Sequence, residues 1–481
     1  MLITTDQQRY DTLGCNGADW MPTPALDALA AQGARFQRAY CTNPVCTPSR
    51  VSIMTGNLPG RHGSYNIGTR AKTTENFLST RLTAAGYRTH LIGKAHFYPW
   101  DCPSEENLPQ FPREPLRNFA GFETAELTVG HSDWGVTGHY EQWLAERGIV
   151  KGKQMPQLQV KRLFPGDAYG TGDWGMPVEY HSGQWIVERT EAFLQEAPKD
   201  RPFFLNLGFQ DPHHPLAVPK DFQKLPLETI PHAQGSYDPT LQHLDALAQG
   251  EIENSRFAGP FGIAGNQNTH WLAYTEEQKQ VIRQYYYTMI ALYDRQIGQL
   301  MELFKQYGVY EDTLFLITTD HGDLLFDHGI GEKGPMAWEE VLHVPLLMVA
   351  PGLIVPQVVD APVSLADLMP TVLEYAGLAA GDCDGLSLRP LLEGKHWQRK
   401  GVCAEFMEEP DRIRYRCYVT AEWKLVEYPG ESFGELYHLA TDPHESRNLY
   451  ALPKYQEIRR KLEECLPLEP VLPLAERPCR C

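Results

Sequence analysis

One short stretch carries most of the information in this chain: Asn43-Pro44-Val45-Cys46-Thr47-Pro48-Ser49-Arg50, followed by Val51-Ser52-Ile53-Met54-Thr55-Gly56. Pro48 suits the first turn of a helix, where its missing N–H would have no partner in any case. A thiol is a strong nucleophile only as a thiolate, and Arg50 would lower the pKa of Cys46 if both lie at the helix start. The alternative is a small buried cysteine before an ordinary helix, which is the usual state of a free cysteine.

Around this stretch, short apolar runs alternate with helical patterns, which predicts an α/β fold with a large, mostly parallel central sheet flanked by helices. Helices are predicted over 24–32, 180–196 and 276–307. Strands are predicted over 2–5, 89–92, 203–208, 314–319 and 345–349.

After about residue 380 the pattern changes to short strand-like pieces and a last helix over 453–465, which predicts a small antiparallel sheet with one helix. We therefore expect a catalytic α/β domain over 1–380 and a smaller α+β subdomain over 381–481. Two stretches without periodicity, near 99–173 and 225–268, are interpreted as insertions over the strand ends, where substrate specificity would lie.

Composition limits the classes of function. The chain has 481 residues, 42% hydrophobic and 22% charged, which is enough to bury a large core. A net charge of -18 argues against nucleic-acid binding, which requires a basic surface, but it does not exclude a small anionic substrate held by a local cluster of cations. The ten cysteines show no C-x-x-C zinc spacing.

The cellular location and the oligomeric state are predicted from weaker features of the sequence. The first residues already resemble the end of a buried strand and leave no room for a signal peptide, so a cytoplasmic location is the expectation, unless the true start lies upstream. No run of eighteen apolar residues predicts a membrane span. The short C-terminal part gives a weak hint of a homo-oligomer.

Polar residues lie just past four of the predicted strands. In an open α/β sheet, ligands bind at the carboxyl ends of the strands, so these residues are candidates for one site. Each pair alone has an ordinary explanation as a turn or loop, and only their joint occurrence at successive strand ends favours a site. The pairs are Asp6 and Gln7, Lys94 and His96, His213 and His214, and Asp320 and His321.

Two carboxylates, an amide oxygen and an imidazole form an oxygen-rich ligand set, which suits calcium, magnesium or manganese better than structural zinc. Such an ion would orient a nucleophile and offset negative charge on the substrate. The cationic and imidazole groups would donate to the remaining substrate oxygens and to the leaving group. These donors are Arg50, Lys94, His96, His213 and Lys333.

The order of these motifs resembles that of the type I sulfatases and the related phosphonate monoester hydrolases, within the alkaline phosphatase superfamily. The C-x-P-x-R core at 46–50 is the specific element, and the others are individually weak. The other matches are Gly93-Lys94-Ala95-His96, Pro212-His213-His214-Pro215, Asp320-His321-Gly322, and Lys333 ahead of Val344-Pro345.

The resemblance implies a hydrolase of sulfate esters in which a maturation enzyme has oxidised Cys46 to formylglycine, whose hydrated aldehyde supplies the nucleophile. It also implies one divalent metal ion, calcium first and manganese or magnesium as alternatives. The implied ligands are Asp6, Gln7, Asp320, His321 and the modified Cys46.

The resemblance also implies a role for each donor. Arg50 would steady the second oxygen of the nucleophile, and Lys94, His213 and Lys333 would hold the sulfate. Either His213 or Lys333 would protonate the departing alcohol, and His96 would be the base that regenerates the aldehyde.

Some residues depart from the common sulfatase pattern. Gln7 stands where many sulfatases have Asp, and His321 where some have Asn, and both resemble the phosphonate monoester hydrolase branch. A phosphonate or phosphate diester hydrolase is therefore the nearest alternative function. A binding protein that never matures Cys46 is the alternative of another class.

The substrate is left open between a small aryl or alkyl sulfate ester and a sugar sulfate ester. Aromatic residues of the aperiodic stretches either stack on it or pack. For His328, a role in its loop is favoured over substrate contact. The aromatic candidates are Trp100, Trp134, Trp174 and Trp271.

Overall fold

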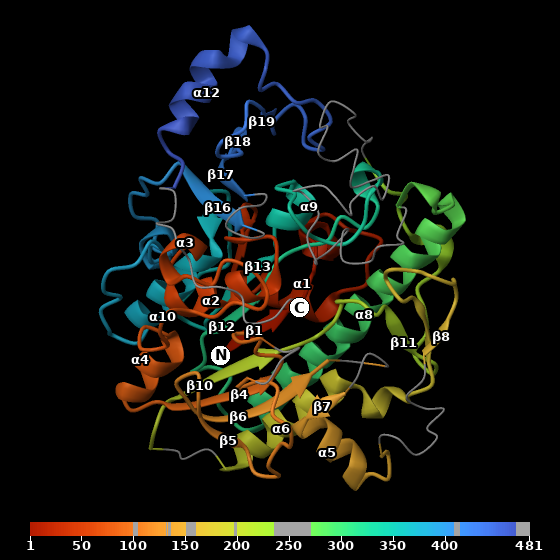
Figure 1. The fold of residues 1–481 in the computed structure, drawn as a ribbon. Helices are drawn as coiled ribbons and strands as arrows, with labels where there is room; N and C mark the ends of the chain where they lie inside the picture. The colour runs from red at the N-terminus through yellow and green to blue at the C-terminus, as the bar shows by residue number, and fades with distance from the viewer. Residues whose placement is uncertain are drawn as a thin grey trace.

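The computed structural model describes residues 1–99, 104–130, 132, 136–150, 160–196, 200–234, 271–407 and 414–467. A large sheet crosses the middle of the molecule, and a smaller sheet lies at one end (Figure 1). Within the described residues, the large sheet has ten strands. In spatial order they are β14 (Gln357–Val359), β2 (Ala34–Phe36), β13 (Leu346–Val349), β12 (Phe315–Thr319), β1 (Leu2–Thr5), β10 (Phe203–Gly208), β4 (Arg88–Gly93), β6 (Phe122–Val129) and β5 (Leu116–Phe119), with β7 (Thr137–Gly138) beside β6.

The middle of this sheet is parallel. β12, β1, β10, β4 and β6 are parallel neighbours, whereas β13 and β5 run antiparallel to the strands beside them. The carboxyl ends of the five central strands therefore share one edge of the sheet. The predicted α/β fold with a large, mostly parallel sheet is confirmed.

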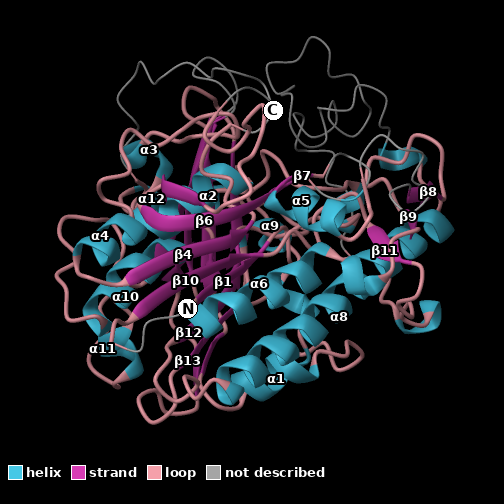
Figure 2. Ribbon diagram, turned by 90° about the horizontal axis from the view of Figure 1, so that it is seen from below, coloured by secondary structure: helices cyan, strands magenta, loops and turns pink. Residues whose placement is uncertain are grey.

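Successive residues of the central strands point into different cores, as the pleat of a strand requires. Leu2 and Leu316 belong to one hydrophobic cluster, while Ile3 and Ile317 belong to the other. Helices cover both faces of the sheet (Figure 2). One face carries α2 (Cys46–Thr55), α4 (Leu78–Ala84) and α10 (Leu368–Tyr375), and the other carries α1 (Pro24–Ala30), α6 (Ser182–Glu196) and α8 (Glu276–Gln306).

The stretch near 99–173 differs from the prediction. Instead of standing wholly outside the sheet as an insertion, it contributes β6, which pairs with β4 along four residues. The pattern hides this strand because Glu126 interrupts it. Glu126 is buried and accepts from Arg189 Nε at 2.6 Å, so its charge is matched inside the protein. The other insertion, near 225–268, lies largely outside the described residues.

Several short elements lie beside the central sheet. A small separate sheet has the order β11-β9-β8, and β3 pairs with β15. Their bounds are β3 (Ala39–Tyr40), β8 (Val160–Arg162), β9 (Gly172–Trp174), β11 (Ala217–Pro219), β15 (Val363–Ser364), α3 (Pro59–His62), α5 (His139–Glu146), α9 (Glu339–Leu342) and α11 (Arg389–Leu392).

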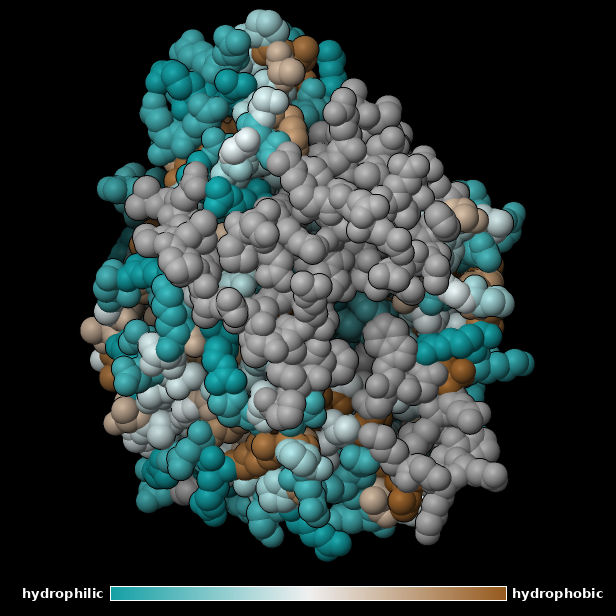
Figure 3. Space-filling view, viewed as in Figure 1, coloured by the Kyte–Doolittle hydropathy of each residue, from teal (hydrophilic) through white to brown (hydrophobic). Residues whose placement is uncertain are grey.

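The C-terminal part forms the antiparallel sheet and helix that the sequence predicts. The boundary near residue 380 stays a prediction. Among the described residues, no helix combines the length and apolar character that a membrane crossing needs. On the face shown in Figure 3, the described side chains are mostly hydrophilic, with apolar ones in small groups. The C-terminal elements are β16 (Gly401–Met407), β17 (Arg414–Thr420), β18 (Trp423–Glu427), β19 (Gly434–His438) and α12 (Gln456–Glu463).

Candidate functional site

Strand ends and one helix start bring the predicted residues together. Asp6 follows β1, and Asp320 follows its parallel neighbour β12. Lys94 follows β4, and Cys46 is the first residue of α2. Because the strands are parallel, these side chains meet at the carboxyl edge of the sheet.

Four of the predicted site residues form a compact cluster. Asp6, Cys46, Asp320 and His321 are all buried, and one ligand atom from each lies within 4.8 Å of the others. Cys46 Sγ lies 3.2 Å from His321 Nε2. The other ring nitrogen of His321 lies 2.8 Å from the carbonyl oxygen of Gly322, so a neutral ring donates there and leaves Nε2 as a ligand. Two carboxylates, an imidazole and residue 46 fit a divalent cation by the chemistry of their donors.

Two cations balance the acids of the cluster. Arg50 Nε donates to Asp320 Oδ2 at 2.7 Å, its Nη2 donates to Asp6 Oδ2 at 3.3 Å, and Lys94 forms an ion pair with Asp6. Burial by itself raises the pKa of Asp6, but Lys94 and then Arg50 outweigh it and hold that pKa well below its usual range.

The prediction of a lowered pKa for Cys46 is wrong, although Arg50 lies at the same helix start. Burial, followed by the Asp6 carboxylate, raises the pKa of the Cys46 thiol to about 12. The charge of Arg50 is already directed at Asp320 and Asp6, and sequence spacing does not show this pairing.

Lys333 lies at the centre of a second group of contacts. Its Nζ donates to Gln7 Oε1 at 2.5 Å and lies 2.8 Å from His213 Nε2. Because an ammonium can only donate, Nε2 of His213 accepts, and its Nδ1 carries the hydrogen that donates to the His214 carbonyl oxygen at 2.5 Å. His213 therefore contacts Lys333, whereas His214 Nδ1 lies 3.4 Å from Gln7 Nε2.

His96 is held in an unusual state. It has a positive φ of 54° and is 5% exposed, and within the described residues neither ring nitrogen has a hydrogen-bond partner. Burial, followed by the charges of Lys94 and Arg50, holds the pKa of His96 well below its usual value. A buried neutral imidazole with two unpaired nitrogens is suited to accept a proton from, or donate one to, a bound molecule.

Two buried acids escaped the sequence analysis. Glu106 accepts the backbone N–H of His96 at 2.9 Å, of Phe97 at 2.5 Å and of Tyr98 at 3.1 Å. Asp323 accepts from the side-chain amide of Gln7. Asp323 lies two residues after His321, and this short separation is the only feature of the sequence that points to Asp323 as part of the site. No spacing connects Glu106 with His96.

The remaining candidates have structural roles in the described part of the chain. His328 stacks on Trp338 with ring centroids 4.0 Å apart and lies 3.2 Å from Glu340 Oε2, which favours its role in the loop. Trp174 and Trp271 are 2% and 0% exposed, so they pack rather than offer a stacking surface. Trp100 and Trp134 lie outside the described residues.

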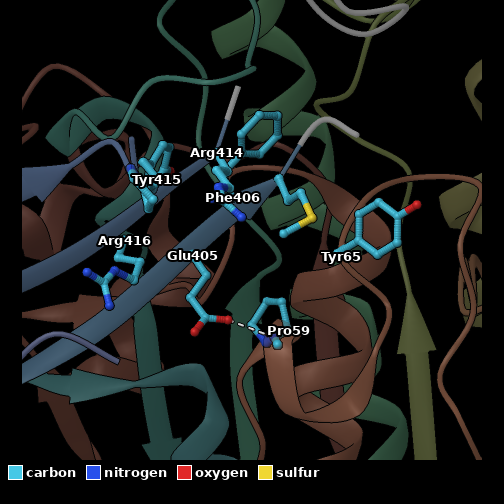
Figure 4. A pocket seen from close by; sticks show the side chains of 10 residues that line it. Pro59, Tyr65, Glu405, Phe406, Arg414, Tyr415 and Arg416 are labelled. Atoms are coloured by element: carbon cyan, nitrogen blue, oxygen red, sulfur yellow. Dashed lines mark hydrogen bonds between the residues drawn. The ribbon is translucent and has the colours of Figure 1, made fainter. Parts of the chain in front are cut away.

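A separate cavity lies between α3 and the ends of β16 and β17 (Figure 4). Glu405 lines it and accepts the backbone N–H of Gly60 at 2.7 Å, and burial raises the pKa of Glu405 to about 7. The predicted site residues do not line this cavity.

Comparisons with known proteins identify the family of the chain. A family model described as "Sulfatase" matches residues 1–378, and one described as "N-sulphoglucosamine sulphohydrolase, C-terminal" matches residues 327–469.

An arylsulfatase of Clostridium perfringens is 30% identical over 468 residues, covering 95% of this chain and 91% of that protein. A choline-sulfatase of Rhizobium meliloti is 26% identical over 467 residues, covering 94% and 82%. The structure of a phosphonate monoester hydrolase of Agrobacterium radiobacter superposes with a TM-score of 0.79 at 25% identity, covering 96% of this chain and 94% of that chain.

Proposed function

Because the chain belongs to the sulfatase family, we propose that it hydrolyses sulfate esters with a formylglycine made from Cys46 and with one bound divalent metal ion. The family membership carries the sulfatase activity. We propose three things beyond this membership: the modified nucleophile, the bound metal ion and the role of each side chain in the reaction. Relatives named as sulfatases make a non-catalytic binding protein the weaker reading.

The observation that carries this proposal is the position of Cys46 inside the acidic cluster. Its sulfur lies 3.2 Å from His321 Nε2 and 3.8 Å from Asp6 Oδ1, so an oxygen on the modified residue would lie among the same ligands. Asp6, Gln7, Asp320, His321 and the modified residue 46 are the proposed ligand set, and calcium is the proposed ion. When bound, the ion would polarise a sulfate oxygen and offset its charge.

The cations around the cluster supply the rest of the anion site. Lys94 lies against Asp6, and Lys333 lies between Gln7 and His213, so both ammonium groups border the position of the nucleophile. Because Nε2 of His213 accepts from Lys333, Lys333 holds the proton that the departing alcohol needs. His213 then keeps Lys333 in place, and Arg50 orients the two carboxylates.

His96 is the proposed base of the last step, in which the aldehyde is regenerated. With Cys46 modified, the hydrated aldehyde would supply two hydroxyls. One would lose its proton as its oxygen bonds to sulfur, while the S–O bond to the alcohol breaks and the alcohol takes a proton from Lys333. A base would then remove the proton of the second hydroxyl, so that sulfate leaves and the aldehyde is restored. His96 is buried and neutral with unpaired ring nitrogens, as that base must be.

The direct test is the mass of the tryptic peptide 39–50 from protein purified out of its native host. A peptide lighter by the difference between a thiol and an aldehyde, with Cys41 still alkylatable, is expected. A fully unmodified Cys46 would contradict the proposal. The variant Cys46→Ala, purified in the same way, gives the background rate of ester hydrolysis.

A second candidate activity is supported by the phosphonate monoester hydrolase that this structure resembles at 25% identity. Gln7 removes one negative charge from the ligand set relative to an aspartate at that position, which eases binding of another tetrahedral anion. We expect an aryl sulfate to be hydrolysed faster than an aryl phosphonate monoester under identical conditions. A strong preference for the phosphonate would reverse the order of the two activities.

The choice between a small and a sugar sulfate ester, the maturation enzyme as a partner, the homo-oligomer and the cytoplasmic location stay predictions. A protein solved in complex with its substrate D-glucosamine-2-N,6-O-disulfate is among the structures that this chain resembles, at 19% identity and a TM-score of 0.71. At that identity the likeness speaks for the shared fold.

A further inference from the structure

The Gln7 side chain lies between two fixed groups with opposite hydrogen-bonding character. Its Nε2 donates to Asp323 Oδ2, and its Oε1 accepts from Lys333 Nζ at 2.5 Å. The backbone of Gln7 is held as well, because its N–H donates to Asp320 Oδ1 at 3.0 Å and its carbonyl oxygen accepts from Tyr286 at 2.7 Å. The side-chain amide of Gln7 can still adopt two orientations, in which its oxygen and its nitrogen exchange places.

From this arrangement we propose that Asp323 is a positioning residue that decides the orientation of the Gln7 amide and thereby holds Lys333 in place. A carboxylate only accepts hydrogen bonds and an ammonium only donates them. Both partners therefore select the same orientation, with the amide nitrogen toward Asp323 and the oxygen toward Lys333. An amide oxygen has two lone pairs, so in this orientation Oε1 accepts from Lys333 and keeps a lone pair for the proposed metal ion. This inference rests on the proposed function, in which Lys333 protonates the departing alcohol.

Asp323 is fixed independently of Gln7. Its Oδ1 accepts from the Tyr169 hydroxyl at 2.6 Å and from the backbone N–H of Leu325 at 2.7 Å. The Tyr169 hydroxyl in turn accepts the backbone N–H of Glu332 at 2.5 Å, and the Tyr169 ring packs 5.7 Å from Trp271. Asp323 is 0% exposed, so water does not compete for its oxygens.

The contacts form one directed chain from Asp323 through Gln7 and Lys333 to His213. If the amide of Gln7 turned over, its NH₂ group would face the ammonium of Lys333, and two donors would meet in a buried site. Lys333 would then move away from the leaving group. Esters whose alcohol is a poor leaving group depend most on that proton, so they should suffer most.

The experiment compares four matched proteins on a series of aryl sulfates with graded phenol pKa: wild type, Asp323→Asn, Gln7→Glu and the double variant Gln7→Glu/Asp323→Asn. Asp323→Asn keeps the volume but can present either an oxygen or an NH₂ group to Gln7. Its kcat/KM should fall on the order of tenfold to a hundredfold, as for other residues that orient a group in a site. The fall should be larger for the less acidic phenols.

The double variant exchanges the amide and the carboxylate without changing the total charge. The carboxylate introduced at position 7 would accept both from Lys333 and from the amide introduced at position 323, so kcat/KM should exceed that of either single variant. In Gln7→Glu alone, the introduced carboxylate lies against that of Asp323. Its kcat/KM should therefore be lower than that of the double variant. A role of Asp323 in folding alone would leave the dependence on phenol pKa unchanged.

Asp312→Asn, an exposed change on another part of the surface, is the control and should match wild type. The inference is overturned if Asp323→Asn keeps the wild-type dependence on phenol pKa, or if the double variant is no faster than the single variants. Should Asp323→Asn fail to fold, the comparison of Gln7→Glu with the double variant decides. Failure of the proposed function is separate, because wild type bearing the modified Cys46 would then hydrolyse none of the sulfates.

Discussion

At the scale of single residues, the site depends on acids that hold other groups in place. Glu106 is the clearest example, since its carboxylate accepts three consecutive backbone N–H groups at the turn that presents His96. His96 has a positive φ of 54°, which a side chain other than glycine rarely adopts without support. Glu106 supplies that support.

We expect Glu106→Gln to lower kcat on the order of tenfold to a hundredfold while the protein stays folded. Glutamine keeps the volume but has only one acceptor oxygen, and its NH₂ group would oppose at least one backbone N–H. Turnover of an aryl sulfate and circular dichroism measure the two effects. Glu105→Gln is the control, because Glu105 is half exposed and pairs with Arg70 at the surface. Equal activity of the two variants would contradict this role.

At the scale of elements, the helix that carries Cys46 is joined to α3 by a buried histidine. His62 Nε2 lies 3.0 Å from the Ser52 hydroxyl of α2, and its Nδ1 accepts the backbone N–H of Ser64 at 3.1 Å. Burial lowers the pKa of His62 from 6.5 to about 3. The folded protein therefore keeps this ring neutral where the unfolded chain protonates it.

This pKa difference makes stability fall as the pH falls. Between the unfolded pKa of 6.5 and the folded pKa of about 3, the unfolded state binds the extra proton, so the free energy of unfolding decreases with acidity. From pH 7 to pH 5 the loss from His62 is about 2 kcal/mol, at about 1.4 kcal/mol per pKa unit. Urea unfolding at both pH values should show a loss smaller by about that amount in His62→Gln. The exposed change His396→Gln should keep the wild-type loss.

At the scale of the whole molecule, a buried ion cluster attaches the C-terminal sheet to the rest of the chain. Lys424 of β18 is 0% exposed, and its Nζ lies 2.8 Å from Glu339 of α9 and 2.8 Å from Glu445. Burial by itself lowers the pKa of Lys424, but the two carboxylates outweigh it and raise that pKa. Lys424 also donates to the carbonyl oxygen of Ala337 at 2.8 Å.

Lys424→Met should lower the free energy of unfolding by about 3–5 kcal/mol, because it leaves the buried Glu445 without its cation and Glu339 with His343 as its remaining ion-pair partner among the described residues. Denaturant unfolding measures the change, and limited proteolysis shows whether the C-terminal sheet detaches first. Lys395→Met is the control, since Lys395 is exposed and pairs only with Glu393 among the ion pairs of the described residues. A loss no larger than in the control would show that the cluster does not stabilise this attachment.

Features that depend on local pattern could be predicted from the amino-acid sequence. Apolar runs and helical periodicity located the long helix α8 and every central parallel strand except β6. The rule that ligands bind at the carboxyl ends of such strands then selected Asp6, Lys94 and Asp320, which the structure places at one edge. The C-x-P-x-R stretch placed Cys46 at the start of a helix, because proline in a first turn is a local preference.

The contacts that hold the site residues, and the charge that these residues carry, could be seen only in the folded protein. Asp323 meets Gln7 across 316 positions of sequence, and Lys333 meets Gln7 across 326. No local pattern encodes such pairs, because chain folding brings their side chains together. The raised pKa of the Cys46 thiol likewise follows from burial and from the nearby Asp6 carboxylate. Burial and long-range charge are properties of the assembled sheet edge, so they do not exist until the strands meet.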